Sequence, residues 1–163
     1  MKRTITLGLG LVFLFATAGA ATAQTLSPGK NVAYTYLTNI PISTSFTSIA
    51  QVSLLKGKKK RVLEVDVKVL DRQLVADALG AYVTVNGVEM NPGSADAPQI
   101  THCNHSWINC TLSSHFWADL DALELAHPGQ FKNQPLTIDV QGVARGTATS
   151  FGTVAVRARM VRK

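Results

Sequence analysis

The side chains best suited to chemistry gather in one short stretch, residues 101–121 (THCNHSWINCTLSSHFWADLD). It holds both cysteines, both tryptophans and three of the four histidines of the chain. Imidazole is a good ligand for Zn²⁺ or Cu²⁺, so His102, His105 and His115 form a hypothetical metal site. Cysteine thiolates would join it only if they stayed reduced, and the spacing fits no zinc motif. Metal binding is therefore an alternative hypothesis, and the main one includes no cofactor.

The two cysteines are more simply explained as a disulfide. An exported chain meets an oxidising compartment, where such a bond persists. A bond between Cys103 and Cys110 would close a loop of eight residues. In the chain-entropy model, a loop of that size stabilises a fold by about 2.5 kcal/mol. The sequence thus predicts a structural bridge, with the nearby histidines exposed to solvent.

Acid–base catalysis would have to use His115, because it alone has carboxylates close in sequence, at Asp119 and Asp121. Ser113 lies two residues from His115, so a strand would place both side chains on the same face. Acyl transfer also needs an orienting group and oxyanion donors, which this stretch does not supply. The G-x-S-x-G and H-E-x-x-H motifs are absent. An exported hydrolase with a site assembled from distant loops is the second alternative.

Aromatic and basic residues provide the candidate contacts for a ligand. Phe116 and Trp117 are neighbours, so on a strand they face opposite ways. We expect one to enter the core and the other to be exposed, covered by the 103–110 loop or buried in a subunit contact. Together with Trp107 they could contact a sugar ring or a protein. A second candidate is the basic segment 57–61 (GKKKR). Its charged side chains could contact an anionic partner; they are Lys58, Lys59, Lys60 and Arg61. No aromatic residues interleave these lysines, so we do not expect nucleic acid as a partner.

The first residues have the order of a cleaved signal peptide. Lys2 and Arg3 precede an apolar run, which ends at Ala21-Thr22-Ala23. The run is too short and glycine-rich to span a bilayer comfortably, and no later segment is apolar enough to do so. We predict cleavage after Ala23 and a secreted or periplasmic location, typical of a bacterial protein. Of the 163 residues, 140 would remain, with 14 basic and 10 acidic side chains and a net charge of +4.

Alternating hydrophobicity predicts an almost entirely β structure. In residues 62–71, Val or Leu alternates with charged residues, which indicates a strand buried on one face. Residues 136–140 and 151–161 show the same period, and Asn86-Gly87 is a hairpin cue. The Asp121 and Glu124 spacing indicates a capped helix over about 121–127, ended by Pro128.

These elements predict an antiparallel β-sandwich. One-sided strands argue against a parallel α/β sheet, whose strands are buried on both faces. We expect residues 24–30 to be a flexible lead-in and residues 31–163 to form a single jelly-roll-like domain, with an immunoglobulin-like sandwich as the alternative. The functional hypothesis is an exported, non-enzymatic binding or assembly module, whose partner is a protein, a glycan or an anionic surface. Oligomers are possible.

Overall fold

A computed structural model describes residues 32–55, 62–71, 73, 76–104, 109–132, 134–146 and 148–163, together with the backbone of residues 24–29. Several predictions from the sequence fall outside this part of the chain: the signal peptide over 1–23, the basic tip with Lys58, Lys59, Lys60 and Arg61, and the side chains of His105 and Trp107.

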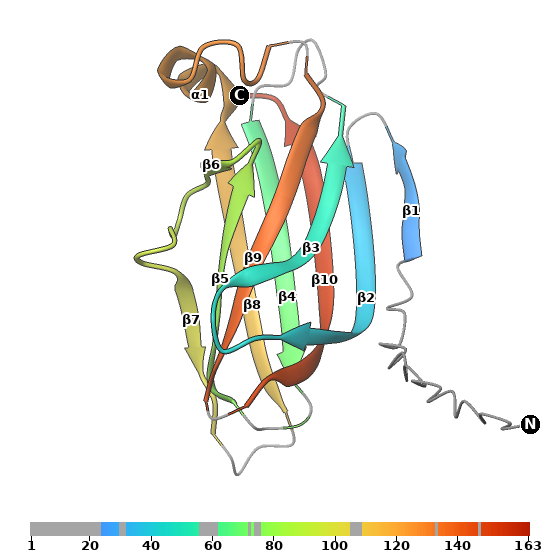
Figure 1. The fold of residues 1–163 in the computed structure, drawn as a ribbon. Coiled ribbons are helices and arrows are strands. Elements are labelled where there is room, and N and C mark those ends of the chain that lie inside the picture. The colour runs from blue at the N-terminus through green and yellow to red at the C-terminus, as the bar shows by residue number, and fades with distance from the viewer. Residues whose placement is uncertain are drawn as a thin grey trace, which may run out of the picture.

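The described chain folds into two antiparallel sheets with one short helix at their end (Figure 1). The elements are β1 (Gln24–Gly29), β2 (Val32–Ile42), β3 (Thr47–Leu54), β4 (Val62–Asp71), β5 (Ala76–Val85), β6 (Val88–Glu89), β7 (Gln99–His102), β8 (Cys110–Asp119), α1 (Leu120–Ala126), β9 (Leu136–Gly146) and β10 (Ser150–Val161).

The order of the strands is that of a jelly roll. Sheet A has the order β1-β2-β10-β4-β8, and sheet B has β3-β9-β5-β6, with β7 also paired to β5. The pairs are nested: β2 pairs with β10, β3 with β9, β4 with β8, and β5 with β6 and β7. This nesting is the double Greek key of a jelly roll. An immunoglobulin domain orders its sheets differently, which excludes that alternative.

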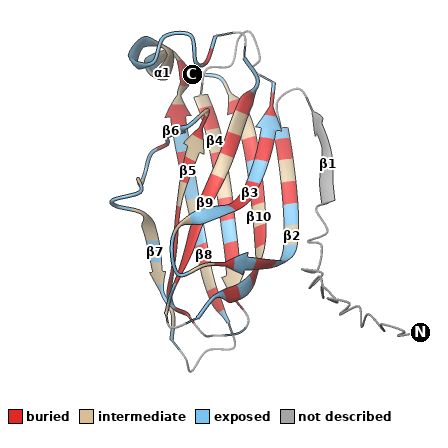
Figure 2. Cartoon of the chain, viewed as in Figure 1, coloured by how far each residue is buried: buried red, intermediate tan, exposed pale blue. Residues whose placement is uncertain are grey.

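The core lies between the sheets and is formed by the inward half of each strand. Along β4, Leu63, Val65, Val67 and Val69 are buried, and the side chains between them are intermediate or exposed. Figure 2 shows a similar alternation of buried and more exposed bands on β10. The one-sided pattern predicted for residues 62–71 is thus confirmed, whereas β5 and β9 also contain runs of consecutive buried residues.

Two local predictions need correction. Residues 24–29, expected to be a flexible lead-in, form strand β1, which pairs with the edge of β2 and satisfies its backbone groups there. The helix begins at Leu120, and its N-cap is Asp119 and not Asp121: Asp119 Oδ1 accepts hydrogen bonds from the backbone N–H groups of Asp121 and Ala122. Strand β8 continues to Asp119, so the helix starts directly where that strand ends.

The predicted disulfide joins Cys103 to Cys110, with their Cα atoms 5.3 Å apart. Cys103 follows β7 of sheet B and Cys110 begins β8 of sheet A. The bond is therefore a covalent tie between the two sheets at one end of the sandwich. No helix in the described ranges is long and apolar enough to cross a bilayer.

Candidate functional site

Outward side chains of sheet A form cross-strand rows, and we call this surface the sheet A face. The antiparallel register aligns each row across β2, β10, β4 and β8 in turn. One row contains Tyr34, Arg157, Asp66 and His115, and the next contains Tyr36, Ala155, Lys68 and Ser113. A third row, on the other side of the first, contains Val32, Arg159, Glu64 and Trp117. Residues far apart in the sequence therefore meet on one surface.

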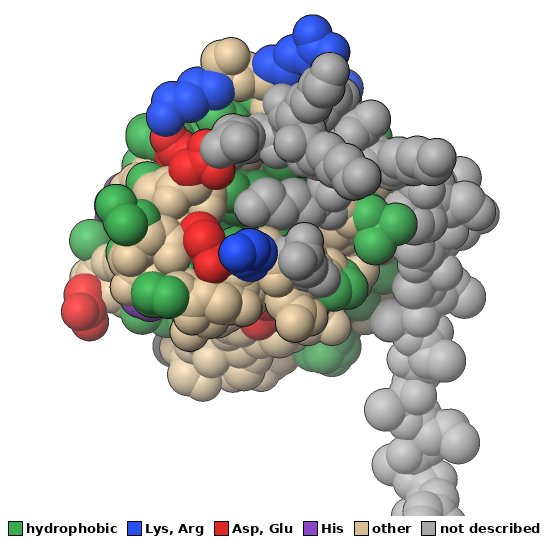
Figure 3. Space-filling model, turned by 90° about the horizontal axis from the view of Figure 1, so that it is seen from above, with side chains coloured by type: hydrophobic (Ala, Val, Ile, Leu, Met, Phe, Trp, Pro, Cys, Tyr) green, Lys and Arg blue, Asp and Glu red, His purple; other side chains and the backbone are tan. Residues whose placement is uncertain are grey.

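Three outward-facing carboxylates of the sheet A face, Glu64, Asp66 and Asp119, are each engaged by a basic group. Glu64 Oε2 accepts a hydrogen bond from Arg159 Nε at 2.6 Å. Asp66 Oδ1 lies 2.7 Å from His115 Nδ1, and Asp119 pairs with Lys163. Viewed from the end that carries α1 and the C terminus, basic and acidic side chains lie close together (Figure 3).

The pKa of Asp119 is lowered by the hydrogen bonds that its carboxylate accepts. The hydrogen bond from Lys163 lowers the pKa of Asp119 below its ordinary value, and the backbone N–H of Asp121 contributes in the same direction. Both donors favour the ionised carboxylate, which also caps the helix. Asp119 thus joins sheet A, α1 and the C-terminal residue through one charged group.

A small hollow of about 170 Å³ opens between the first two rows of the sheet A face. Ala155 of β10 forms the floor of this hollow. Its side chain is short, and the longer side chains around it form the rim. The rim consists of Tyr34, Asp66, Lys68, Ser113 and Arg157. The hollow thus places a phenol, a hydroxyl, one carboxylate and two cations around an alanine floor.

Trp117 is the large aromatic residue that this surface exposes at its β8 edge. It is 46% exposed, whereas its neighbour Phe116 is fully buried in the core. The prediction that the two rings face opposite ways is confirmed, and Phe116 belongs to the core. Asn91 forms a short bridge to Trp117: the Trp117 N–H donates to Asn91 O at 2.6 Å, and the Asn91 N–H donates to Trp117 O at 3.1 Å. The Trp117 backbone is thereby held on both sides, by β4 and by Asn91.

The histidines are distributed differently from the predicted metal site. His102 belongs to β7 in sheet B and His115 to β8 in sheet A. Within the described ranges, no three histidine, cysteine or acidic side chains gather closely enough to hold a metal ion. The disulfide also removes the two thiolates as ligands. His105 is outside the described residues, so its part of the hypothesis stays a prediction.

The carboxylate beside His115 comes from the neighbouring strand. The sequence suggested Asp119 or Asp121, but the register places Asp66 directly opposite His115. A histidine oriented by a carboxylate is part of many hydrolase sites. Here Ser113 and His115 form no hydrogen bond with each other. The side chains of His115 and Asp66 are 48% and 44% exposed. The arrangement lacks an activated nucleophile and a site that excludes water.

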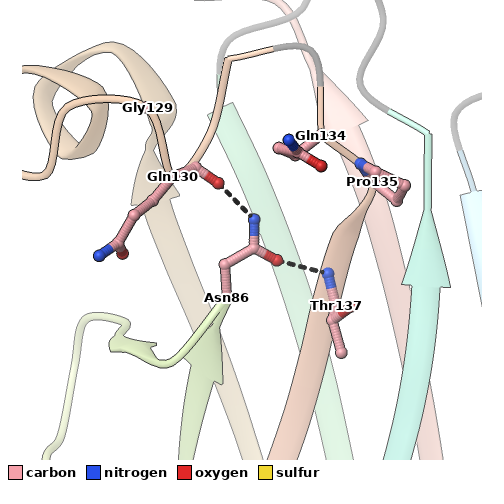
Figure 4. Close-up of a pocket in the computed structure, with 6 residues that line it drawn as sticks. All are labelled: Asn86, Gly129, Gln130, Gln134, Pro135 and Thr137. Atoms are coloured by element: carbon pink, nitrogen blue, oxygen red, sulfur yellow. Dashed lines mark hydrogen bonds between the residues drawn. The ribbon is translucent and has the colours of Figure 1, made fainter.

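A second, larger hollow of about 430 Å³ lies at the end of the sandwich near α1 (Figure 4). Asn86 stands between its walls: its side-chain amide donates to Gln130 O, and its Oδ1 accepts from the Thr137 N–H, both at 2.8 Å. Asn86 is the first residue of the predicted Asn-Gly turn, and its φ of 49° agrees with that turn. Its amide thus braces the β5–β6 turn against β9.

Sequence reasoning missed the hollow on the sheet A face, although part of the signal was present. Alternation alone places Asp66 and Lys68 outward on β4, and Arg157 outward on β10. Nothing in the sequence states that β10 lies between β2 and β4. Only the register brings Tyr34, Arg157 and Lys68 to the same place.

Comparison with known proteins adds a resemblance of fold. No family model matches this chain, and no curated protein matches it. Among solved structures, it resembles the PRD1 vertex protein P5 with a TM-score of 0.42 and 11% sequence identity. The match covers 89% of this chain and 85% of that one. Similarity at this level assigns neither a function nor a partner.

Proposed function

We propose that this chain is an exported, non-enzymatic binding module that contacts its partner through the sheet A face. The observation that carries the proposal is the exposure of Trp117 at 46% and of Tyr36 at 40%, at opposite sides of a face filled with charged residues. Exposed aromatic rings on a rigid scaffold dominate the energetics of many contacts. Strands hold these two rings, so little conformational entropy is lost when a partner binds.

The proposed export is supported by the predicted signal peptide and by the disulfide, which an oxidising compartment preserves. The case against catalysis rests on the geometry of the sheet A face. The pair of Asp66 and His115 is open to solvent, and among the residues that the structure describes no hydroxyl group is hydrogen bonded to the imidazole. The function proposed therefore depends on surface complementarity and not on bond making.

The test uses the purified mature chain and its variant Trp117→Ala, screened in parallel on a glycan array and by sedimentation for self-association. The matched control is Leu125→Ser, because Leu125 is an exposed apolar residue on α1, 85% accessible and outside the sheet A face. We expect binding, or self-association, to be lost in Trp117→Ala and retained in Leu125→Ser. Equal behaviour of Trp117→Ala and the unaltered protein in both assays, or equal loss in the control, would contradict the proposal.

A further inference from the structure

On the sheet A face, the outward-facing carboxylates have basic partners, but two of the basic side chains have no acidic partner in the part of the chain that the structure describes. The outward-facing carboxylates, Glu64, Asp66 and Asp119, each have a basic partner. Among the described residues, Lys68 and Arg157 form no salt bridge and no side-chain hydrogen bond. Asp66 lies directly opposite Arg157 across the strand pair, but its hydrogen bond goes to His115 and it forms no salt bridge with Arg157. The face therefore has two cations without a protein partner.

Both of these cations line the hollow above Ala155. Lys68 is the cross-strand partner of Ala155, and Arg157 lies two residues further along β10. They are therefore diagonal neighbours, whose Cβ atoms are roughly 7–8 Å apart in an antiparallel pair. Two long basic side chains at this spacing can approach one small anionic group from opposite sides.

The other members of the rim suit the same kind of ligand. Ser113 lies opposite Lys68 on β8 and offers a hydroxyl donor. Tyr34 adds a phenol and a ring face from β2. Arg157 can donate two parallel hydrogen bonds to a carboxylate or to a sulfate, and charge-assisted bonds of this kind are the strong ones.

We propose that the hollow binds one anionic group, a sulfate or a carboxylate, carried by an acidic glycan. This inference rests on the proposed function, since it names the ligand class of the same face. A space of about 170 Å³ is smaller than the pockets that enclose drug-sized ligands, so it holds a single substituent. The rest of the glycan lies across the open sheet. There Tyr34 and Tyr36, two residues apart on β2, present their rings to the sugars.

A glycan fits this surface better than a membrane does. The two unpaired cations lie beside a depression in the middle of a sheet, between β2 and β8, and not on a protruding edge. A linear chain can enter such a depression with one substituent, whereas a flat lipid surface requires basic groups that project beyond their surroundings. Binding to vesicles is accordingly an outcome that would oppose the inference.

The experiment is calorimetric titration of the purified mature chain at physiological ionic strength. The ligands are an oligogalacturonate, a sulfated galactan oligomer, the uncharged galactan oligomer and inorganic sulfate, and vesicles of phosphatidylglycerol are tested separately. We expect both acidic oligomers to bind more tightly than inorganic sulfate, and the uncharged oligomer to bind weakly. Lys68→Gln and Arg157→Gln should each weaken the acidic oligomers about tenfold, as expected for the loss of a charge-assisted hydrogen bond.

Two variants separate the hollow from the overall basic charge of the protein. Arg162→Gln removes the same charge from an exposed position beyond β10, outside the hollow, and should leave affinity almost unchanged. Asp66→Asn removes the carboxylate of the rim and should strengthen binding, an effect that unfolding cannot produce. Circular dichroism of each variant verifies the fold.

Three results would overturn the inference: equal weakening by Arg162→Gln and Arg157→Gln, equal affinity for charged and uncharged oligomers, or binding to vesicles without binding to either acidic oligomer. If some ligand depends on Trp117 while the substitutions at Lys68 and Arg157 have no effect, the proposed function survives and this inference fails. If no ligand depends on Trp117, Lys68 or Arg157, both fail.

Discussion

The two outer faces of the sandwich differ in how they satisfy their charges. On the sheet A face, carboxylates pair with cations, as in Glu64 with Arg159. Near the middle of sheet B, Asp139 instead accepts hydrogen bonds from neutral groups, the hydroxyl of Ser48 and the amide of Gln141. Both sheets bury the same kind of apolar core, so the fold leaves the outer faces free to carry different chemistry.

Aromatic residues on the two faces differ in the same sense. On sheet B, Tyr82 packs against Phe46 with ring centroids 5.1 Å apart and an interplanar angle of 70°. An edge-on contact of this type stabilises the protein's own surface. On sheet A, Trp117 remains 46% exposed. The contrast is that sheet B packs Tyr82 against a neighbouring ring, whereas sheet A leaves Trp117 exposed.

The largest effect should come from adding one methyl group to a glycine in each sheet. Gly152 of β10 lies in sheet A, where a Cβ atom would be 2.7 Å from the carbonyl oxygen of Leu70, a backbone atom. Gly142 of β9 lies in sheet B, where the Cβ would clash with the side chain of Ile49, which can change rotamer. We expect Gly152→Ala to lower the free energy of unfolding by about 1–3 kcal/mol, and Gly142→Ala to lower it less.

Urea unfolding of the two glycine variants measures this difference. A loss in Gly142→Ala as large as that in Gly152→Ala would show that the sheets tolerate added volume equally. The contrast between a rigid backbone contact in sheet A and an adaptable side-chain contact in sheet B would then be wrong.

A smaller effect is expected at acid pH, on the sheet A side. Asp119 has a lowered pKa in the folded protein, so its carboxylate stabilises the fold at neutral pH. This stabilisation is lost as the pH falls below about 3.8, the ordinary pKa of the group, and through the lower pKa of the folded state. Asp119→Asn keeps an oxygen that can cap α1 but loses the ion pair with Lys163. The midpoint temperature of thermal unfolding of Asp119→Asn should therefore be lower than that of the unaltered protein at pH 7. The two midpoints should become equal at a pH low enough to protonate Asp119 in the folded protein.

Thermal unfolding from pH 7 downward, at low and at high salt, follows this effect. Lys163 is 66% exposed, so added salt should reduce the difference between the two proteins. A difference that persists unchanged at the lowest pH would assign the effect to capping alone.

The smallest effect is expected at alkaline pH, on the sheet B side. Partial burial raises the pKa of Tyr82, and the carboxylates of Glu89 and Asp139 raise it further. Above pH 10.0, the ordinary value, the unfolded chain releases this proton before the folded one does, so stability falls as pH rises. Tyr82→Phe should lose less stability between pH 9 and 11, and Glu89→Gln should show an intermediate loss. Equal alkaline slopes for Tyr82→Phe and the unaltered protein in thermal unfolding would exclude this contribution.

Local features were predictable because they depend on neighbouring residues. The alternation in residues 62–71, the Asn-Gly turn and the opposite orientation of Phe116 and Trp117 follow from the period of a strand and from turn chemistry. The disulfide followed from the compartment and from the cysteine count. In each case the information lies within a few residues of the feature.

Features that depend on register were not predictable. His115 finds Asp66 and not Asp119, because β8 lies antiparallel to β4 and the partner is set by alignment across the sheet. The helix cap moved from Asp121 to Asp119 because β8 extends to that residue. The hollow needs three strands in a defined order, which local periodicity does not encode.

The nested pairing of the jelly roll also determines when the sheet A face can form. Strand β10 comes last in the sequence but lies between β2 and β4, so Val32 aligns with Arg159 from the opposite end of the chain. Such high contact order makes folding slow, since the closure entropy of long loops is lost before distant contacts form. The sheet A face therefore cannot form stepwise from the N-terminal strands, because it is complete only after β10 with Arg157 has joined the sheet.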